Sequence, residues 1–463
     1  MSAAPASSRN PLKAVLDIRR DELPLAAAMF GYFFLVITTF WILKTIKKEL
    51  FVRFYDQQGL DLLGWSLKAA EAELLAKLLN MLVAAVAVVA FSALSNRFTR
   101  HRLTLIFCGF FGLCFLGYAA ALDQPGHLLV WSFYLFGDLY STLMVATFFA
   151  FLNDSVEPAA ARRLYGPIIL GGVGGGAFGS MVVLSHIGEV GRSSWVWISL
   201  LITGVVAGLA LFAGTLVERG RTGAAPDGAA APPAEEAPQD SNPALAGARL
   251  VRRSSYLLAI VSIVGVYEII STILDFQFTA TVAHYLDGPE ISKQFARVYT
   301  ITNVAALLVQ LCLTSALMSR FRLTVSLLVT PVAVIAASGT FLAVPLLWPG
   351  SLLSSADNAL AYSINQSARE ALYTPTRREE KYKAKAFIDM FVQRLAKSVA
   401  VGISLLMSSV FTSFGGIRYL SIFTIAFASL WVLAARHAGR RFHQLSGEGE
   451  TAGGRGERGT SAG

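Results

Sequence analysis

The chain has 463 residues, of which 54% are hydrophobic and only 15% are charged, and its mean hydropathy is +0.56. A soluble domain of this length needs more polar surface, so the composition excludes an ordinary soluble protein and indicates an integral membrane protein. The formal net charge of +9 would suggest nucleic acid as a partner of a soluble protein. Here most of that charge lies in short loops between apolar segments, so no nucleic-acid partner is expected.

Twelve apolar segments follow one another along the chain, each close to the about 20 residues that a helix needs to cross a bilayer core. The first has no small-residue cleavage site after it, so we interpret it as a retained helix and not as a signal peptide. The segments predict an all-α integral membrane fold, with helices at 24–43, 73–95, 103–122, 128–152, 164–187, 193–217, 256–283, 295–318, 322–346, 350–373, 386–412 and 417–438.

Basic residues concentrate in every second loop, for example at 96–102, 249–253 and 436–441. The positive-inside rule then places both termini in the cytoplasm of a multi-pass protein. The Ala-, Gly- and Arg-rich composition is typical of a bacterium with GC-rich DNA, so the expected location is a bacterial inner membrane.

The chain divides at 218–248, where Ala, Pro and acidic residues predominate and large apolar side chains are almost absent. This composition predicts a disordered cytoplasmic linker. It separates an N-terminal half of six helices, 1–217, from a C-terminal half of six helices, 249–443, and a second disordered tail is predicted at 444–463.

The two halves carry a sequence repeat. The segment "SALSNRFTRHRLTL" at 92–105 recurs as "SALMSRFRLTV" at 315–325, in each case after the second helix of its half. Two parallel repeats of six helices predict the twelve-helix major-facilitator fold of secondary transporters.

Ionisable residues lie inside several of the apolar segments, where an ion costs at least about 2.5 kcal/mol and usually faces a water-filled pathway. Structural ion pairs between helices are the alternative. Arg394 and Lys397 are three residues apart and share a helix face. Lys48 is expected to extend toward the membrane surface. The candidate substrate-binding residues are Lys44, Lys47, Asp138, Glu268, Asp275, Glu370, Arg394 and Lys397.

Their charges suggest a division of roles. Cationic groups would hold an anionic small molecule, and Asp138, Glu268 and Glu370 would pair with those cations when the site is empty. Any proton coupling would also involve these carboxylates or Asp275, because no His relay is visible. No nucleophile, phosphate-binding loop or metal-ligand motif is visible, so we expect no enzyme, no catalytic residue, no metal and no cofactor.

Glycines follow one another at "GGVGGGAFG", residues 171–179. No strand precedes them, so a dinucleotide-binding loop is not expected. Gly171, Gly175 and Gly179 have the small-xxx-small spacing that lets membrane helices approach closely.

The segment "EALYTPTRREEKYKAKAFIDMFVQRLAKS" at 370–398 resembles the ATP/ADP translocase (nucleotide transporter) family of intracellular bacteria and plastids, within the major facilitator superfamily. By this resemblance, Lys47 stands at the family's transport-critical Lys, Lys44 replaces an Arg, and Asp138 replaces a Glu. The chain differs from the family pattern at Thr45 and at Ala396. The resemblance implies the same fold and a nucleotide substrate.

These observations favour a secondary membrane transporter of nucleotides, of the ATP/ADP exchange type, that works as a monomer by alternating access. Lys44, Lys47, Arg394 and Lys397 would hold phosphate oxygens through charge-assisted hydrogen bonds. Two alternatives stay open at this point. One is a proton-coupled major-facilitator carrier of another anionic metabolite. The other is a non-transporting membrane sensor or scaffold that uses the linker or tail for docking.

Overall fold

The computed structural model describes residues 19–62, 64–95, 97–156, 158–223, 243–314, 323–376, 384–385 and 387–456. Several sequence predictions fall outside these ranges: most of the linker, at 224–242; the start of the second repeat, at 315–322; the basic loop at 377–383; and the end of the tail, from 457. The predictions of disorder for the linker and the tail therefore stay predictions. In the described residues, α7 (Arg192–Gly223), α8 (Pro243–Arg253) and α18 (Leu420–Gly456) are helical.

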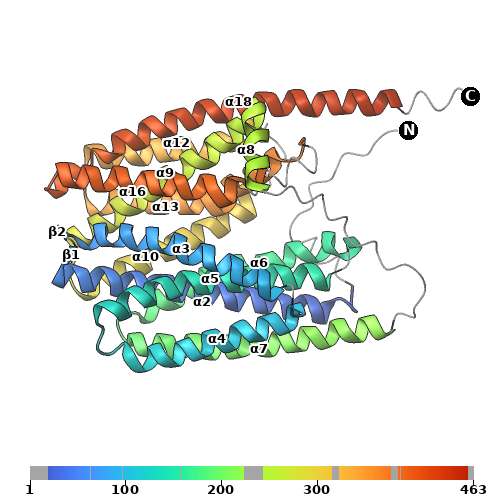
Figure 1. The fold of residues 1–463 in the computed structure, drawn as a ribbon, viewed down its shortest axis with the longest axis horizontal. Helices are drawn as coiled ribbons and strands as arrows, with labels where there is room; N and C mark the ends of the chain where they lie inside the picture. The colour runs from blue at the N-terminus through green and yellow to red at the C-terminus, as the bar shows by residue number, and fades with distance from the viewer. Residues whose placement is uncertain are drawn as a thin grey trace, which may run out of the picture. The chain divides into compact units, whose positions relative to one another are not determined.

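The described chain is nearly all helical (Figure 1), and it contains ten helices that are long and apolar enough to cross a membrane. Two further predicted segments, 350–373 and 386–412, are helical too, but π-helical turns interrupt them. These turns are η2 (Ala361–Asn365) and η3 (Ile388–Val392). π-Helical turns inside α-helices are often found at functional sites.

The chain folds into two compact units. Unit 1 comprises the described residues of Met1–Asp227 and Val282–Leu307, and unit 2 those of Gly228–Thr281 and Leu308–Gly463. Besides α7, the helices of unit 1 are α2 (Leu23–Gln58), α3 (Ala69–Ser95), α4 (Arg100–Ala121), α5 (His127–Ser155), α6 (Pro158–His186) and most of α10 (Pro289–Leu308).

In unit 1, α2 and α6 pack so closely that only glycine fits at the contact. A Cβ added at Gly171 would lie 2.7 Å from the carbonyl oxygen of Phe30, and one added at Gly179 would lie 2.8 Å from that of Thr38. Gly175 meets the backbone of the same helix between these two points. The glycines therefore serve helix packing, as their spacing predicts.

Helix α10 packs in unit 1, although the repeat places it in the C-terminal half of the sequence. The Thr300 hydroxyl donates a hydrogen bond to the Ser180 carbonyl of α6, at 2.9 Å. The Tyr299 ring packs edge-on against Trp41 of α2, with ring centroids 5.5 Å apart. The packing units thus differ from the sequence halves at this helix because its polar face contacts α2 and α6.

A two-stranded hairpin, which no sequence pattern predicted, connects α2 to α3. Strands β1 (Leu60–Leu62) and β2 (Trp65–Leu67) pair antiparallel, and Gly64 provides the left-handed conformation of the turn, with φ of +82°. A residue with a side chain rarely adopts this conformation, which explains glycine there.

Unit 2 is built around an apolar core that includes the fully buried Trp431. Tyr267 packs edge-on against this buried indole. With η2, η3, α8 and α18, the elements of unit 2 are most of α9 (Ser255–Tyr285), η1 (Val309–Thr314), α12 (Leu323–Ala343), α13 (Leu347–Leu360), α14 (Gln366–Leu372), α16 (Gln393–Val410) and α17 (Phe414–Ile417).

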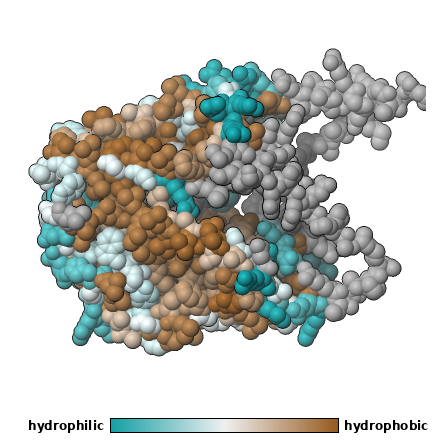
Figure 2. Space-filling view, in the orientation of Figure 1, coloured by the Kyte–Doolittle hydropathy of each residue, from teal (hydrophilic) through white to brown (hydrophobic). Residues whose placement is uncertain are grey.

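Apolar side chains cover much of the helix surface visible in Figure 2, and hydrophilic side chains gather toward the helix ends. Leu201 on α7 and Val86 on α3, for example, are 71% and 70% exposed. Exposed leucine and valine along the middle of long helices are expected where lipid and not water covers them.

Candidate functional site

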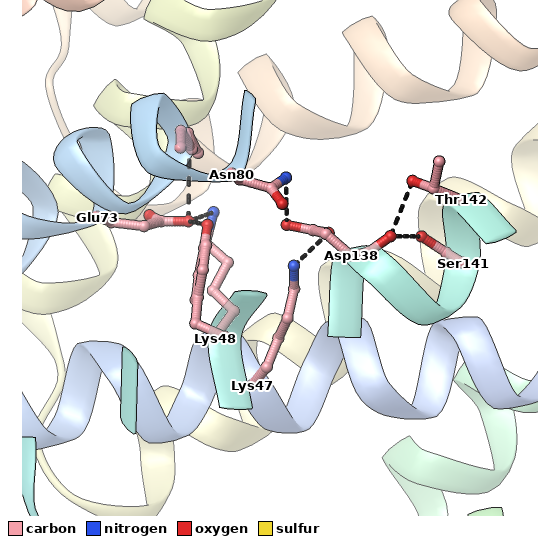
Figure 3. A network of polar contacts seen from close by, with 9 residues as sticks. Lys47, Lys48, Glu73, Asn80, Asp138, Ser141 and Thr142 are labelled. Atoms are coloured by element: carbon pink, nitrogen blue, oxygen red, sulfur yellow. Dashed lines mark hydrogen bonds and ion pairs between the residues drawn. The ribbon is translucent and has the colours of Figure 1, made fainter. Parts of the chain in front are cut away.

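The first part of the site is an ion pair between α2 and α5 of unit 1. The ammonium group of Lys47 contacts Asp138 Oδ1, and the side chain of Lys47 is only 6% exposed. Asn80 of α3 donates a hydrogen bond to the other carboxylate oxygen of Asp138, at 2.9 Å. Figure 3 shows the three side chains converging from three helices. Asp138 is 26% exposed, so the carboxylate is less enclosed than the lysine.

Gly137 makes room for the Lys47 stem. A Cβ at Gly137 would lie 2.7 Å from Lys47 Cδ. The lysine therefore crosses directly over the backbone of α5 before it reaches the next residue, Asp138. Its ammonium group also lies 4.3 Å from the centre of the Tyr134 ring, where the negative face of the ring attracts a cation.

A second charged centre lies beside the first one. Lys48 Nζ is 3.2 Å from Glu73 Oε1, and Lys77 Nζ of α3 is 3.7 Å from the same oxygen. The Tyr134 hydroxyl donates a hydrogen bond to it at 2.9 Å. Glu73 is only 2% exposed. The expectation that Lys48 extends to the membrane surface is therefore wrong, because a buried carboxylate from the next helix holds it inside the unit.

Helix α3 links the two centres. Glu73, Lys77 and Asn80 are spaced by four and three residues, so they lie on one helix face. Glu73 and Lys77 belong to the second centre, and Asn80 holds Asp138 of the first. The result is one polar network that joins α2, α3 and α5 (Figure 3).

Lys44 lies one turn of α2 before Lys47, among aromatic rings. Its ammonium group is 4.3 Å from the Trp41 ring centre and 5.1 Å from that of Tyr299. The faces of these rings attract a cation.

The third carboxylate of this region is Glu49 on α2, which forms an ion pair with α7. The guanidinium group of Arg192 donates two hydrogen bonds to Glu49, at 2.9 and 2.7 Å, and Arg53 donates one at 2.8 Å. A buried carboxylate with two arginines is well satisfied. We interpret this cluster as structural.

Unit 2 contributes an ion pair between α16 and α9. Lys397 Nζ lies 3.5 Å from Glu268 Oε2, and the two side chains are 46% and 14% exposed. The structure thus brings together one of the candidate cations and one of the candidate carboxylates.

The remaining sequence candidates are also in unit 2, and one differs from its expected role. Glu370 pairs with Lys385 at 2.7 Å and not with one of the four candidate cations. Glu370 is 51% exposed near the end of α14, where Lys385, which lies just before η3, reaches it. Asp275 and Arg394 are both partly buried. Arg394 is the second residue of α16, which follows η3, and it lies one turn before Lys397.

Sequence reasoning missed Glu73, Lys77 and Asn80. A signal was present, since their spacing is that of one helix face at the start of an apolar segment. Among the described residues, no group of three or more His, Cys, Asp or Glu could hold a metal ion. The network consists of lysines paired with carboxylates, and an anionic ligand could compete with the carboxylates for these lysines.

Comparison with known proteins bears on this geometry. The family model described as TLC ATP/ADP transporter matches residues 126–352 and 350–442, together well over half of the chain. No curated protein matches the chain.

Several solved structures share the fold. A bacterial homologue of the human lysosomal transporter Spinster, in an inward-facing and unoccupied conformation, is 12% identical with a TM-score of 0.58, covering 91% of this chain and 98% of that one. A mutant of the nucleoside transporter NupG is 14% identical with a TM-score of 0.61, covering 89% and 99%. The E. coli fucose:proton symporter FucP is 13% identical with a TM-score of 0.52, covering 91% and 99%.

At these identities the structures show the fold alone, and that fold is the predicted major-facilitator architecture. The match to the family model extends over both sequence halves and includes Asp138, Glu268 and Lys397. The chain is therefore a member of the TLC ATP/ADP transporter family with a major-facilitator fold.

Proposed function

We propose that this protein is a secondary carrier that exchanges nucleotides of the ATP and ADP type across a membrane by alternating access. Membership of the family supports a nucleotide substrate. The observation that carries the proposal is that each unit holds a lysine against a carboxylate in a membrane-spanning helix. These pairs are Lys47 with Asp138 in unit 1 and Lys397 with Glu268 in unit 2.

Such pairs suit a carrier of polyphosphates. A lysine donates equally well to carboxylate and phosphate oxygens, and charge-assisted hydrogen bonds of this kind are about twice as strong as neutral ones. Phosphate can therefore replace the carboxylate as the partner of Lys47. When substrate leaves, the carboxylate takes the lysine back, so no buried ion stays unpaired.

This competition makes movement depend on substrate. In the empty carrier, the ion pair between Lys47 and Asp138 connects α2 to α5. In the loaded carrier, phosphate takes the place of Asp138 as the partner of Lys47. Exchange follows if only the loaded form changes conformation quickly. A ligand shifts a conformational equilibrium only by its difference in affinity for the two states.

The finer assignments belong to the same proposal. We expect the carrier to work as a monomer in the inner membrane of a bacterium, with both termini in the cytoplasm, because the basic loops alternate with poorly charged ones. We expect binding and release of a small anionic molecule, with no catalytic step.

The test is exchange in liposomes. Purified protein is reconstituted in vesicles with or without internal ADP, and the uptake of labelled ATP is followed. We expect internal ADP to raise the initial rate of uptake at least tenfold. Equal uptake by loaded and empty vesicles would exclude exchange, and no uptake of any nucleotide by folded protein would exclude the substrate class.

A proton-coupled carrier of another anionic metabolite is the second candidate. One observation favours it: Glu73 is a buried carboxylate in a membrane-spanning helix, and its Oε2 has no hydrogen-bond partner among the described residues. Carboxylates at such positions often belong to proton relays in transporters. A protonophore would abolish uptake by a proton-coupled carrier. Nucleotide exchange would continue in its presence.

A further inference from the structure

Helix α8 of unit 2 has one basic face and one apolar face. Arg249, Arg252 and Arg253 are exposed, and the second and third follow the first by three and four residues, so all three share a helix face. The other face is apolar, since Val251 lies in the core of the unit and Leu250 packs against that core. α8 is therefore an amphipathic helix whose outer face is positively charged.

The end of the apolar part of α18 has the same arrangement. Ala435 and Ala438 are buried in the same core as Val251, and Phe442 packs against it. The opposite side of α18 carries four exposed basic side chains, which are Arg436, His437, Arg440 and Arg441. Together with the three arginines of α8, we call these residues the basic surface of unit 2.

The sequence around the basic surface contains no carboxylate. No Asp or Glu occurs between Asp240 and Glu268, or between Asp389 and Glu448. Glu268 already pairs with Lys397. These parts of α8 and α18 thus carry positive charge with no negative charge of their own to offset it, and such a surface attracts anions.

The basic residues of α18 lie directly beyond a lipid-facing strip. They fall at the end of the apolar span Phe414–Phe442. Leu433 is exposed in the middle of this span, and Arg436 and His437 follow it by three and four residues, on the same face. Because one turn of helix advances about 5.4 Å, these side chains are at the depth expected for lipid headgroups.

Helix α8 is placed in a similar way. It ends at Arg253, two residues before the membrane-spanning helix α9 begins, and Leu258 in the first turn of α9 is exposed. In Figure 1, α8 runs across the direction of α9 and α18. An amphipathic helix that lies across the spans, with a basic face and a buried apolar face, is typical of the membrane surface.

We propose that the basic surface of unit 2 binds the phosphate groups of anionic phospholipids. Arginine suits this ligand, because its guanidinium group donates two parallel hydrogen bonds to phosphate oxygens. Clusters of basic residues on an amphipathic helix beside a membrane span are typical sites for anionic headgroups. Bound lipid holds α8 and the start of α9 at the membrane surface, so anionic lipid should stabilise the folded protein. This inference does not depend on which substrate the carrier transports.

The test measures lipid binding by the full-length protein in mild detergent, without nucleotide. The probes are phosphatidylglycerol, which is anionic, and phosphatidylcholine, which has no net charge. Native mass spectrometry gives the dissociation constant of each lipid, and thermal unfolding gives the melting temperature with each lipid added. Inorganic phosphate is then added as a competitor, to distinguish a lipid headgroup from a free anion.

The variants remove two positive charges at a time. They are Arg252→Gln with Arg253→Gln on α8, Arg436→Gln with Arg440→Gln on α18, and the charge-preserving pair Arg252→Lys with Arg253→Lys. The matched control is Lys293→Gln with Arg418→Gln. It also removes two positive charges, but these follow the far end of α9 along the chain and precede the far end of α18.

We expect wild-type protein to bind phosphatidylglycerol at least tenfold more tightly than phosphatidylcholine, and to melt at a higher temperature with the anionic lipid. Each glutamine pair should weaken phosphatidylglycerol binding at least fivefold and leave phosphatidylcholine binding unchanged. The lysine pair should stay within about threefold of wild type, since it keeps the charge, and the control should match wild type. A misfolded variant is recognised by weaker binding of both lipids.

Three results would overturn the lipid surface. The first is equal binding of the two lipids by wild-type protein, and the second is an unchanged preference in both glutamine pairs. The third is displacement of phosphatidylglycerol by an equal concentration of inorganic phosphate, which would identify a site for free anions.

The acidic linker is the competing occupant of the surface, because residues 225–240 include Asp227, Glu235, Glu236 and Asp240. If phosphatidylglycerol binds only after this segment is deleted, the linker and not lipid covers the surface in the intact protein, and the proposal is wrong. All of these outcomes are independent of exchange in liposomes, so failure of the lipid surface and failure of nucleotide transport are distinguishable.

Discussion

The two units hold their membrane-embedded lysines in different ways. In unit 1, Lys47 and Lys48 are 6% and 5% exposed and belong to one network across three helices. In unit 2, Lys397 is 46% exposed and its carboxylate lies at 3.5 Å. Removing one partner of a buried pair leaves an ion without compensation, whereas an exposed pair contributes little to stability. We therefore expect the lysines of unit 1 to contribute to both stability and transport. Lys397 should contribute mainly to transport.

The largest effect is expected for Lys47→Ala. It removes a candidate phosphate ligand and leaves Asp138 with only Asn80. We expect exchange to fall by at least 100-fold, which corresponds to about 2.7 kcal/mol, and the melting temperature to fall as well. Initial rates in liposomes and thermal unfolding in detergent measure the two effects. Normal uptake by this variant would contradict the site.

Lys397→Ala sharpens the comparison because it should separate the two effects. Exchange should fall at least tenfold, and the melting temperature should fall less than in Lys47→Ala, because Lys397 is 46% exposed and its carboxylate lies at 3.5 Å. Arg394→Ala, one turn away on the same helix, should also abolish uptake. A loss of stability as large as that of Lys47→Ala would show that the two units do not differ in this respect.

Gly137→Ala tests the close crossing of Lys47 over α5. The added methyl group would lie 2.7 Å from Lys47 Cδ, so the lysine must shift away from Asp138. We expect a several-fold rise in KM for ATP and a modest loss of stability, since overpacking costs about 1–3 kcal/mol. Gly117→Ala on α4, where no atom lies within 4 Å, is the matched control and should behave as wild type.

A smaller effect is expected for Glu370→Gln. Glu370 and Lys385 are 51% and 38% exposed, and such pairs contribute about 0–1 kcal/mol. Uptake and melting temperature should both stay close to wild type. A severe transport defect with intact folding would instead support the sequence prediction that Glu370 pairs with the cations of the substrate site.

The smallest effect concerns pH. Arg163 lies 2.5 Å from Glu22, and its hydrogen bond lowers the pKa of Glu22 below the ordinary value of 4.5. The pair therefore stabilises the folded protein above that pH, and its contribution is lost as the pH falls through the lowered pKa. The difference in melting temperature between wild type and Glu22→Gln should be small and positive at pH 7. It should vanish in strongly acidic buffer, and a difference that grows there would contradict the assignment.

Much of the fold could be predicted because its signals are local. The glycine spacing at 171–179 depends on one helix alone, and it correctly predicted close packing. Segment length likewise predicted ten of the helices. The place of α10 could not be predicted this way, since it depends on Tyr299 and Thr300 meeting residues far back along the chain.

The candidate site was predictable to a similar extent. Charged residues inside apolar segments are visible in the sequence, and Asp138 and Lys47 stood out. Their partners were not visible. Glu71 and Glu73 both begin α3, but the first caps the helix by accepting a hydrogen bond from the backbone of Lys68, and only the second faces Lys48.

The most direct test of the account is the affinity of Asp138→Asn for ATP. If the carboxylate competes with phosphate for Lys47, the neutral amide should release the lysine and preserve the shape of the site. We then expect the Kd for ATP to fall by about tenfold, or 1.4 kcal/mol, while exchange in liposomes becomes slower. A weaker affinity for ATP in this folded variant would contradict the competition between carboxylate and phosphate on which the proposed exchange depends.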